Sequence, residues 1–411
     1  MSFNRGTIRP RRSRSAVPLL GGLVVGMLGS LLVAPASAAV PAAAPATAAP
    51  TSAPAPAPEL TGLALGADRL PDCTAAVTAM TPRARLAQRL MVGVEGDDPA
   101  GTASTVRDTQ VGGIFVGGNA TQLLRNQSLR GVQAASRVPL AVAVDDEGGR
   151  VQRIDALDGE LPSARTLAAT KTPLEVRDVA RERAKKLLAR GITMNMAPDA
   201  DVSNQPADDV IGDRSFSNDP DTVTTYALAY ALGQREAGIF TVLKHFPGHG
   251  HSSGDSHKGR VTTPPLAQLK ADDLKPYATL LGDGGALADN NGRGRTAVMV
   301  GHLDVPDLTT DLPSSLTPAV YQLLRGQYGF DGLVMTDDLG AMKAITDEFA
   351  LPEAVQRALE AGADMALWTS GGKVTPVLDA LQQALTSGKL DGAANDKAVA
   401  RILAAKGLCT R

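Results

Sequence analysis

Four of the chain's five histidines lie within one short segment, KHFPGHGHSSGDSH, which covers residues 244–257. These histidines are His245, His249, His251 and His257, and Asp255 lies two residues before the last of them. Imidazole groups at this density serve as metal ligands or as acids and bases, because their ordinary pKa lies near neutral pH. The segment is therefore the first candidate for chemistry.

A zinc site would use several of these imidazoles, but the segment is rich in glycine and follows an apolar run. Helical spacing that aims two histidines at one metal is not expected there, so we predict no metal and no cofactor. Asp255 can instead orient the imidazole of His257 and favour its imidazolium form, which suits proton transfer. A solvated loop without any chemical role would have the same spacing. The four glycines between residues 248 and 259 also predict a mobile loop.

Eight short apolar runs alternate with longer amphipathic segments between residues 85 and 411. The segment at 174–191 repeats apolar residues three and four positions apart and ends in a glycine, which is typical of a helix. Eight strand–helix units predict an α/β fold, a single (β/α)8 barrel of the TIM type, with a doubly wound open sheet as the alternative. The predicted strands cover residues 90–94, 112–118, 139–145, 192–198, 240–246, 296–302, 332–337 and 364–368.

Chemically capable residues follow several of these runs at their C-terminal ends. In a barrel, all of these ends open onto one face, which is where active sites lie. The residues would then converge in space although they are scattered in the sequence. They are Asp145, Lys244, His245, His302, Asp337 and Asp338.

Two further motifs could bind a polar ligand. VDDEGGRVQR, residues 144–153, ends in Arg153 and combines acids with glycines that let a backbone approach a ligand, although a charged surface turn would look similar. VIGDRSF contains Arg214, which as a single arginine is also typical of a surface loop. Asp337 or Asp338 could simply cap a helix, and Trp368, the only tryptophan, could stack on a sugar or close the core.

The N-terminal region has a different composition. Residues 1–38 begin with five arginines and no acid, continue with an apolar run and end in Ala-Ser-Ala, which predicts a signal peptide removed after export, with a retained membrane anchor as the alternative. Residues 39–61 are almost entirely Ala, Pro, Thr and Ser and predict an extended linker. We expect the folded domain to cover residues 62–411.

Cysteine use and charge add two expectations. Cys73 and Cys409, the only two cysteines, lie near the ends of this domain and can pair in an oxidising compartment, with two buried free thiols as the alternative. The 41 basic and 43 acidic side chains nearly cancel, so the chain lacks the basic excess of nucleic-acid-binding proteins. A neutral or weakly charged ligand is expected.

Taken together, the motifs resemble those of the family 3 glycoside hydrolases, in particular their bacterial β-N-acetylglucosaminidase branch. KHFPGHG followed by DSH, with DDEGGRVQR and GDRSF upstream and TDD downstream, occurs here in the order of that family and covers the domain from residue 62 to 411. His251 and Ser252 depart from the family's usual Asp-Thr. Asp338 beside Asp337 means that the choice of nucleophile rests on the motif.

The resemblance implies a role for each matching residue. Asp337 would be the nucleophile, and His257, oriented by Asp255, would be the general acid/base. The remaining residues would hold the sugar or line the same mouth. They are Asp145, Arg153, Arg214, Lys244, His245 and His302.

The implied activity is that of an exported retaining glycosidase. It would release terminal non-reducing β-linked N-acetylglucosamine, with peptidoglycan fragments as the expected substrate, through a covalent glycosyl-aspartate intermediate. A β-glucosidase, a phosphorylase on the same site and a non-catalytic wall-binding protein are the alternatives. We expect a secreted or cell-wall-associated monomer that binds carbohydrate, binds no nucleic acid and has no stable membrane insertion once the signal is cleaved.

Overall fold

The computed structural model describes residues 70–288 and 295–411. The predicted signal peptide, the predicted linker and the first residues of the predicted domain lie outside these ranges. None of the helices within them combines the length and the hydropathy that a membrane-spanning helix needs.

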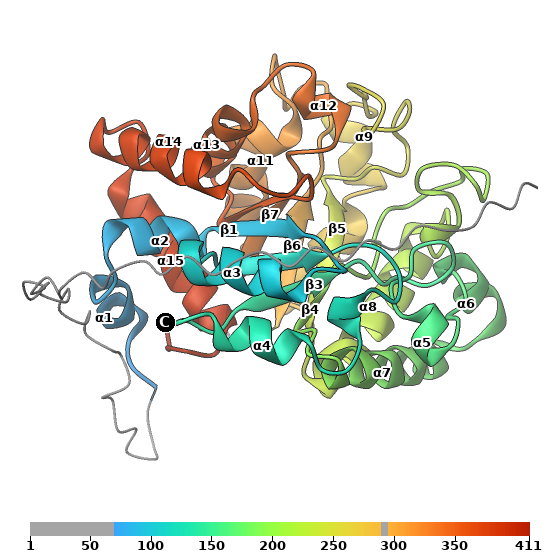
Figure 1. Cartoon of the computed structure of the whole chain (residues 1–411). Helices are drawn as coiled ribbons and strands as arrows, with labels where there is room; N and C mark the ends of the chain where they lie inside the picture. The colour runs from blue at the N-terminus through green and yellow to red at the C-terminus, as the bar shows by residue number, and fades with distance from the viewer. Residues whose placement is uncertain (1–69, 289–294) are drawn as a thin grey trace, which may run out of the picture. The chain divides into compact units, whose positions relative to one another are not determined.

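A closed barrel of eight parallel strands forms the centre of the fold (Figure 1). Each strand pairs with the next along the chain, and the last pairs with the first. The predicted barrel is confirmed, and the alternative of an open sheet is wrong. The strands are β1 (Leu90–Val94), β2 (Gly113–Val116), β3 (Ala141–Val144), β4 (Met194–Asn195), β5 (Phe240–Phe246), β6 (Thr296–Val300), β7 (Leu333–Asp338) and β8 (Met365–Trp368).

Strand side chains alternate between the barrel interior and the layer under the helices, as the two-residue period of a strand requires. In β3, Ala141 and Ala143 join the interior cluster, whereas Val142 and Val144 join the outer core. All strands are therefore buried on both faces, which explains their nearly continuous apolar sequences. Methionines supply much of the interior filling: Met91, Met194, Met196, Met299, Met335 and Met365.

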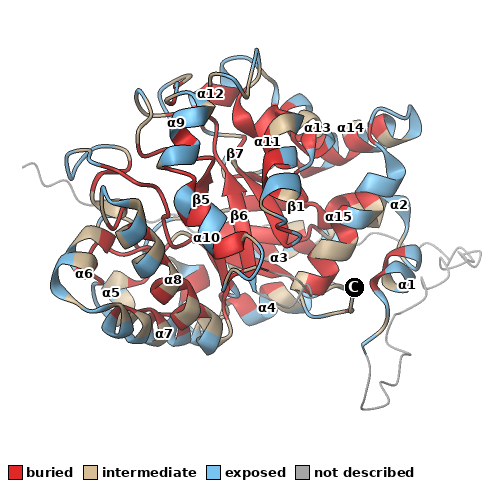
Figure 2. Ribbon diagram, turned by 180° about the vertical axis from the view of Figure 1, so that it is seen from behind, coloured by how far each residue is buried: buried red, intermediate tan, exposed pale blue. Residues whose placement is uncertain are grey.

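Helices surround the barrel, with buried inner faces and exposed outer faces (Figure 2). The longer ones begin at clear sequence signals: α7 starts with Pro173 behind a capping box of Thr172 and Glu175 and ends two residues before Gly191. This confirms the helix predicted at 174–191. The α-helices are α1 (Cys73–Thr78), α2 (Pro82–Gln88), α3 (Pro99–Thr109), α4 (Leu129–Ala134), α5 (Asp155–Asp158), α6 (Ala164–Thr170), α7 (Pro173–Ala189), α8 (Pro220–Ala237), α9 (Leu266–Ala271), α10 (Lys275–Leu281), α11 (Pro318–Gln322), α12 (Lys343–Thr346), α13 (Leu351–Ala361), α14 (Val374–Thr386) and α15 (Gly392–Ala405).

Trp368, at the end of β8, lies in the outer core and is fully buried. Its indole N–H donates to the carbonyl oxygen of Gly372, 3.3 Å away. The tryptophan therefore belongs to the core, as the second of the two readings of the sequence expected, and does not offer a stacking surface.

A disulfide joins Cys73 in α1 to Cys409 just after α15, and the two cysteines are 336 residues apart in the sequence. Both cysteines pack in a small apolar cluster with Val77, Val399 and Leu403. A parallel bridge between Asp72 and Thr410 runs beside the disulfide. The two ends of the barrel domain are thus fastened to each other, as the cysteine positions predicted.

We expect Cys73→Ser to lower the free energy of unfolding by about 2–4 kcal/mol, because the unfolded chain regains the freedom that a very long closed loop removes. Urea denaturation of the oxidised wild type and the variant measures this difference. Reductant should destabilise the wild type by a similar amount and leave the variant unchanged. Equal stability of oxidised wild type and variant would contradict the expectation.

Candidate active site

Three polar side chains occupy the next inward-facing positions above the barrel core. Asp145 continues the inward phase of β3, Lys244 that of β5 and Asp337 that of β7, each two residues after an apolar interior residue. Layers inside such a barrel come from alternate strands, and these three strands are alternate ones. The strand period therefore aims all three groups into the mouth at the C-terminal ends of the strands.

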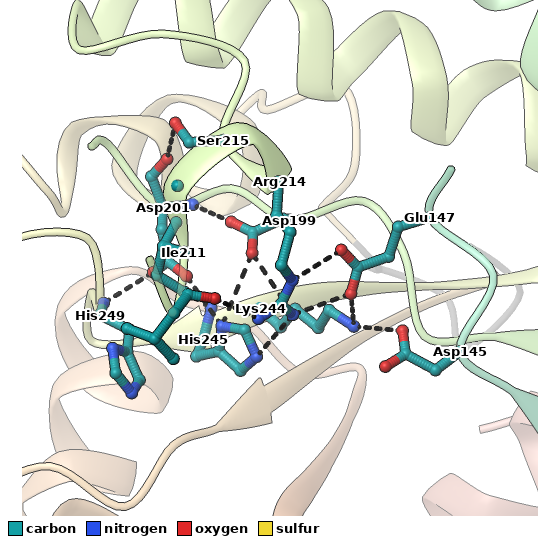
Figure 3. A network of polar contacts seen from close by, with 12 residues as sticks. Asp145, Glu147, Asp199, Asp201, Ile211, Arg214, Ser215, Lys244, His245 and His249 are labelled. Atoms are coloured by element: carbon teal, nitrogen blue, oxygen red, sulfur yellow. Dashed lines mark hydrogen bonds and ion pairs between the residues drawn. The ribbon is translucent and has the colours of Figure 1, made fainter. Parts of the chain in front are cut away.

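A buried carboxylate, Glu147, connects this layer to the loops above it (Figure 3). Its side chain accepts two hydrogen bonds from Arg214 at 2.8 Å each and lies 2.5 Å from the ammonium of Lys244. Lys244 also donates to Asp145 at 2.6 Å. Burial alone would raise the pKa of Glu147, but Arg214 and Lys244 hold it well below its ordinary value. Glu147 is therefore a permanent anion between two cations.

Two arginines hold the loop that carries Arg214. Arg150 donates to Asp213 at 2.7 Å and to the carbonyl oxygens of residues 207 and 209–211. Arg165, in α6, donates to the carbonyl oxygens of residues 203, 205 and 212. Because a loop has no ladder of its own to satisfy these carbonyls, the guanidinium groups fix its shape and aim Arg214 at Glu147.

A second buried ion pair supports the segment that carries Asp145 and Glu147. Asp146, fully buried between Asp145 and Glu147, accepts from the Nε of Arg183 at 2.7 Å. Its backbone N–H donates to Asn195 in β4 at 2.9 Å. Successive side chains of this segment thus alternate in direction: Asp145 and Glu147 point toward the mouth, and Asp146 between them points into the scaffold.

His245 and two aspartates that follow β4 form the next part of the site (Figure 3). Asp201 accepts from the Nδ1 of His245 at 2.7 Å, and Arg214 lies 3.4 Å from its Nε2. Burial and Arg214 lower the pKa of His245 to about 4, so its imidazole is neutral at neutral pH. Burial and the charge of Asp201 raise the pKa of Asp199 to about 8.

Asp337 is half-buried at the end of β7. Burial alone would raise its pKa, but His245, His302 and the backbone N–H of Asp338 lower it to about 2. His245 is already protonated at the pH where Asp337 titrates, so its positive charge acts on the carboxylate there. Asp337 is therefore ionised at any ordinary pH, as a nucleophile must be.

His302 lies beside this strand end and is almost fully buried. Its ring nitrogens contact the hydroxyl of Ser315 at 2.7 Å and the carbonyl oxygen of Asp338 at 3.0 Å. Burial lowers its pKa, so the ring is neutral. Because both ring nitrogens are hydrogen-bonded, His302 supports the end of β7. Its predicted contact with sugar stays a prediction. Asp338 itself accepts from Thr369 and Gly340 within the scaffold.

The loop with His257 lies over the segment that follows β7. The Nδ1 of His257 contacts Asp255 at 2.8 Å, which is the predicted orienting pair, and the side chain of His257 is 63% exposed. Burial alone would raise the pKa of Asp255, but hydrogen bonds from the backbone and ring of His257 lower it. Backbone N–H groups of Lys343 and Ala344 donate to the carbonyls of His257 and Ser256. The loop is docked by these contacts, and its predicted motion during turnover stays a prediction.

Arg153, a predicted sugar contact, joins this network through its backbone and not through its guanidinium group. Its N–H donates to Asp146, and one guanidinium nitrogen donates to the carbonyl of Gln152. Its Nε is buried without a hydrogen-bond partner in the part of the chain that the structure describes. Its predicted contact with substrate therefore remains a prediction.

Two groups of described residues have ligand atoms close enough to hold a metal: Asp199, Asp201 and His245, and His251, Asp272 and Asp273. In the first, Arg214 lies 3.6 Å from Asp199, and a fixed positive charge there opposes a metal cation. In the second, the Nδ1 of His251 lies 2.9 Å from a carboxylate oxygen of Asp273, so a hydrogen bond between the two residues already uses that nitrogen. The site chemistry described above does not require either group to bind a metal.

Sequence reasoning missed four members of the site: Glu147, Asp199, Asp201 and His249. Two signals were available. Glu147 and His249 lie inside the quoted motifs, and the aspartates directly follow the predicted strand at 192–198, where the rule used for the other strand ends applies.

Comparison with known proteins agrees with this geometry. The family model described as glycosyl hydrolase family 3 N terminal domain matches residues 81–405. The chain belongs to glycosyl hydrolase family 3. It is 49% identical over 335 residues to the β-hexosaminidase LpqI of Mycobacterium tuberculosis, a match that covers 80% of this chain and 83% of that protein.

Solved structures of this family have the same fold. A family 3 glycosyl hydrolase of Mycobacterium smegmatis is 51% identical with a TM-score of 0.75, and the match covers 80% of this chain and 98% of that one. The β-N-acetylhexosaminidase of Beutenbergia cavernae is 28% identical with a TM-score of 0.71, over 80% of this chain and 99% of that one. This family 3 protein is therefore a glycoside hydrolase.

We expect kcat/KM of this family 3 enzyme to fall as the pH drops through about 6, because burial and Glu147, opposed by Lys244, raise the pKa of Asp145 to about 6. In its predicted role as a sugar contact, the ionised carboxylate, present above that pH, would accept hydrogen bonds from sugar hydroxyls, and the protonated form would lose part of that capacity. Asp145→Asn cannot titrate and should lack this acid limb. A pH profile of kcat/KM, which reports the free enzyme, measures it. An acid limb unchanged in the variant would assign the limb to another group.

Proposed function

We propose that this chain is an exported, retaining β-N-acetylhexosaminidase. It releases terminal non-reducing β-linked N-acetylglucosamine, with peptidoglycan fragments as its natural substrates. The observation that carries the proposal is the presence of an ionised Asp337 at the barrel mouth together with the His257–Asp255 pair, on a loop docked on the segment that follows β7. Relatives named β-hexosaminidase and β-N-acetylhexosaminidase support the sugar specificity.

The reaction proceeds in two displacements. In the first, the carboxylate of Asp337 attacks the anomeric carbon while the imidazolium of His257 gives its proton to the leaving glycosidic oxygen. A glycosyl-aspartate ester forms and the aglycone leaves. In the second, neutral His257 takes a proton from water, the water oxygen attacks the anomeric carbon and Asp337 leaves. Two inversions restore the β-configuration.

The polar cluster orients the sugar for these steps. Asp145 and Lys244 lie together at the mouth, and Arg214 and His245 belong to the same network of polar contacts (Figure 3). Carboxylate, ammonium and guanidinium groups suit a neutral polyhydroxylated ligand because each makes directed hydrogen bonds. Their mutual ion pairs hold them in place before the ligand binds, which reduces the ordering cost of binding.

Export is supported by the signal-like residues 1–38 and by the disulfide between Cys73 and Cys409. Disulfides persist in oxidising compartments and are rare in the cytosol. Outside the membrane, cell-wall fragments are the β-linked N-acetylglucosaminides that such an enzyme meets. This links the proposed location to the proposed substrate.

A phosphorylase on the same site is the second candidate. It is favoured by the imidazole of His257, because a carboxylate in that position would repel an incoming phosphate anion, whereas an imidazole does not. Phosphate would then replace water in the second displacement. A dependence of turnover on phosphate separates the two candidates.

The purified chain should release the chromophore from a nitrophenyl β-N-acetylglucosaminide and give sugar whose first-formed anomer, observed by NMR, is β. Asp337→Asn should lose at least about 10³-fold in kcat, because the covalent intermediate cannot form. Asp338→Asn is the matched control, since it removes a neighbouring carboxylate that the scaffold uses. An α-anomer as the first product would contradict the retaining mechanism. Sugar 1-phosphate that forms only when phosphate is present would identify a phosphorylase.

Removal of the proposed acid should depend on the leaving group. His257→Ala is expected to lower kcat/KM by about 10²-fold or more on an unactivated disaccharide, whose leaving oxygen needs a proton, and far less on a dinitrophenyl glycoside. Asp255→Asn should follow the same pattern more weakly. Equal losses on both substrates would argue against a leaving-group acid.

A further inference from the structure

One buried contact in the histidine-rich loop has no place in the chemistry described above. The Nε2 of His249 lies 3.1 Å from the hydroxyl of Ser256, and the two residues are 2% and 0% exposed. Ser256 directly precedes His257, the proposed acid/base. A hydrogen bond in such a dry environment fixes its partners, because breaking it leaves a polar atom unsatisfied.

One arrangement of the protons around His249 satisfies all the contacts of its ring and of Ser252. Burial and the charge of His245 lower the pKa of His249 to about 4, so the ring is neutral, with one donor and one acceptor nitrogen. The hydroxyl of Ser252 donates to the carbonyl of Gly254 at 3.1 Å, so its oxygen accepts the Nδ1–H of His249 at 2.9 Å. Nε2 is then the acceptor, and it receives the hydroxyl proton of Ser256.

His249 is also fastened to the sugar-binding side of the site. Its backbone N–H donates to Oδ1 of Asp201 at 2.7 Å, and Oδ2 of the same carboxylate contacts the Nδ1 of His245 at 2.7 Å (Figure 3). Asp201 is fully buried and cannot shift without breaking both contacts. The contact between His249 and Ser256 is therefore anchored through Asp201 to the part of the site that holds His245.

His257 lacks such support of its own. Its side chain is 63% exposed, and its carbonyl accepts from the backbone of Lys343 only at 3.4 Å. Asp255 orients the ring but belongs to the same loop. The position of the imidazole, whose charge acts on Asp337, therefore depends on how the neighbouring Ser256 is held.

We propose that His249 and Ser256 are positioning residues that hold His257 in place for proton transfer. Neither touches the sugar, and both act through the loop backbone. The inference rests on the proposed role of His257. It deepens that function by naming the contact that keeps the acid/base over the site.

A merely structural role would lower stability and would affect all substrates equally. A positioning role acts only where His257 moves a proton. Comparing kcat/KM on two substrates therefore distinguishes the two roles, because kcat/KM includes the first displacement. In that step an unactivated N-acetylglucosamine disaccharide needs a proton from the acid, whereas a dinitrophenyl β-N-acetylglucosaminide does not.

Ser256→Ala in the full chain is expected to lower kcat/KM about tenfold on the disaccharide and about twofold or less on the dinitrophenyl glycoside. In a His257→Ala background, the same change should add no further loss, because no imidazole is left to position. Ser314→Ala is the matched control: it removes another fully buried hydroxyl, bonded to the carbonyl of Leu303, and should leave the ratio between the substrates unchanged.

A second pair of variants keeps the test sharp if Ser256→Ala does not fold. His249→Gln retains an acceptor near the position of Nε2 and should keep most of the disaccharide activity, whereas His249→Asn retains only a group near Nδ1 and should behave like Ser256→Ala. Equal losses on both substrates, or a further loss in the His257→Ala background, would overturn the positioning role alone. A wild type inactive on both substrates would overturn the proposed function as well.

Discussion

Glu147 places one negative charge between two buried cations, and two loops and one strand of the barrel depend on that contact. Glu147 lies on the loop after β3, Lys244 lies within β5 and Arg214 lies on the loop between β4 and α8. Removing one partner would leave a charge without compensation in a dry environment, which costs several kcal/mol in typical cases, about 3–5. The shape of the mouth is therefore set by electrostatics above an apolar core, with the Asp146–Arg183 pair as its foundation.

The same environment gives carboxyl groups of one chemical type different protonation states. Cationic neighbours and a backbone N–H lower the pKa of Asp337, while burial and a neighbouring acid raise the pKa of Asp199. Asp145, beside both Lys244 and Glu147, lies between these extremes. Separation of this kind lets one site hold an ionised carboxylate, a titrating carboxylate and a protonated carboxyl group at the same pH.

The strands could be predicted from the sequence because each is a short apolar run that is buried on both faces. The convergence of Asp145, Lys244 and Asp337 followed from the fold, since strand ends share one face. The roles of Glu147 and Asp201 could not be predicted, because they depend on partners about 50 or more residues away, Arg214 and His249 respectively among them. Asp337 and Asp338 are neighbours of one type, and only the inward phase of β7 separates the group in the mouth from the group in the scaffold.

The thioether filling of the barrel interior has a consequence for oxidative damage. Conversion of a buried methionine to its sulfoxide adds a polar group to a core that has no partner for it. Met91, Met299, Met335 and Met365 are each at most 3% exposed, so an oxidant meets their sulfur atoms only when the barrel opens. Sulfoxide at these positions therefore records past opening of the barrel, and its presence would keep the strands from closing again as tightly.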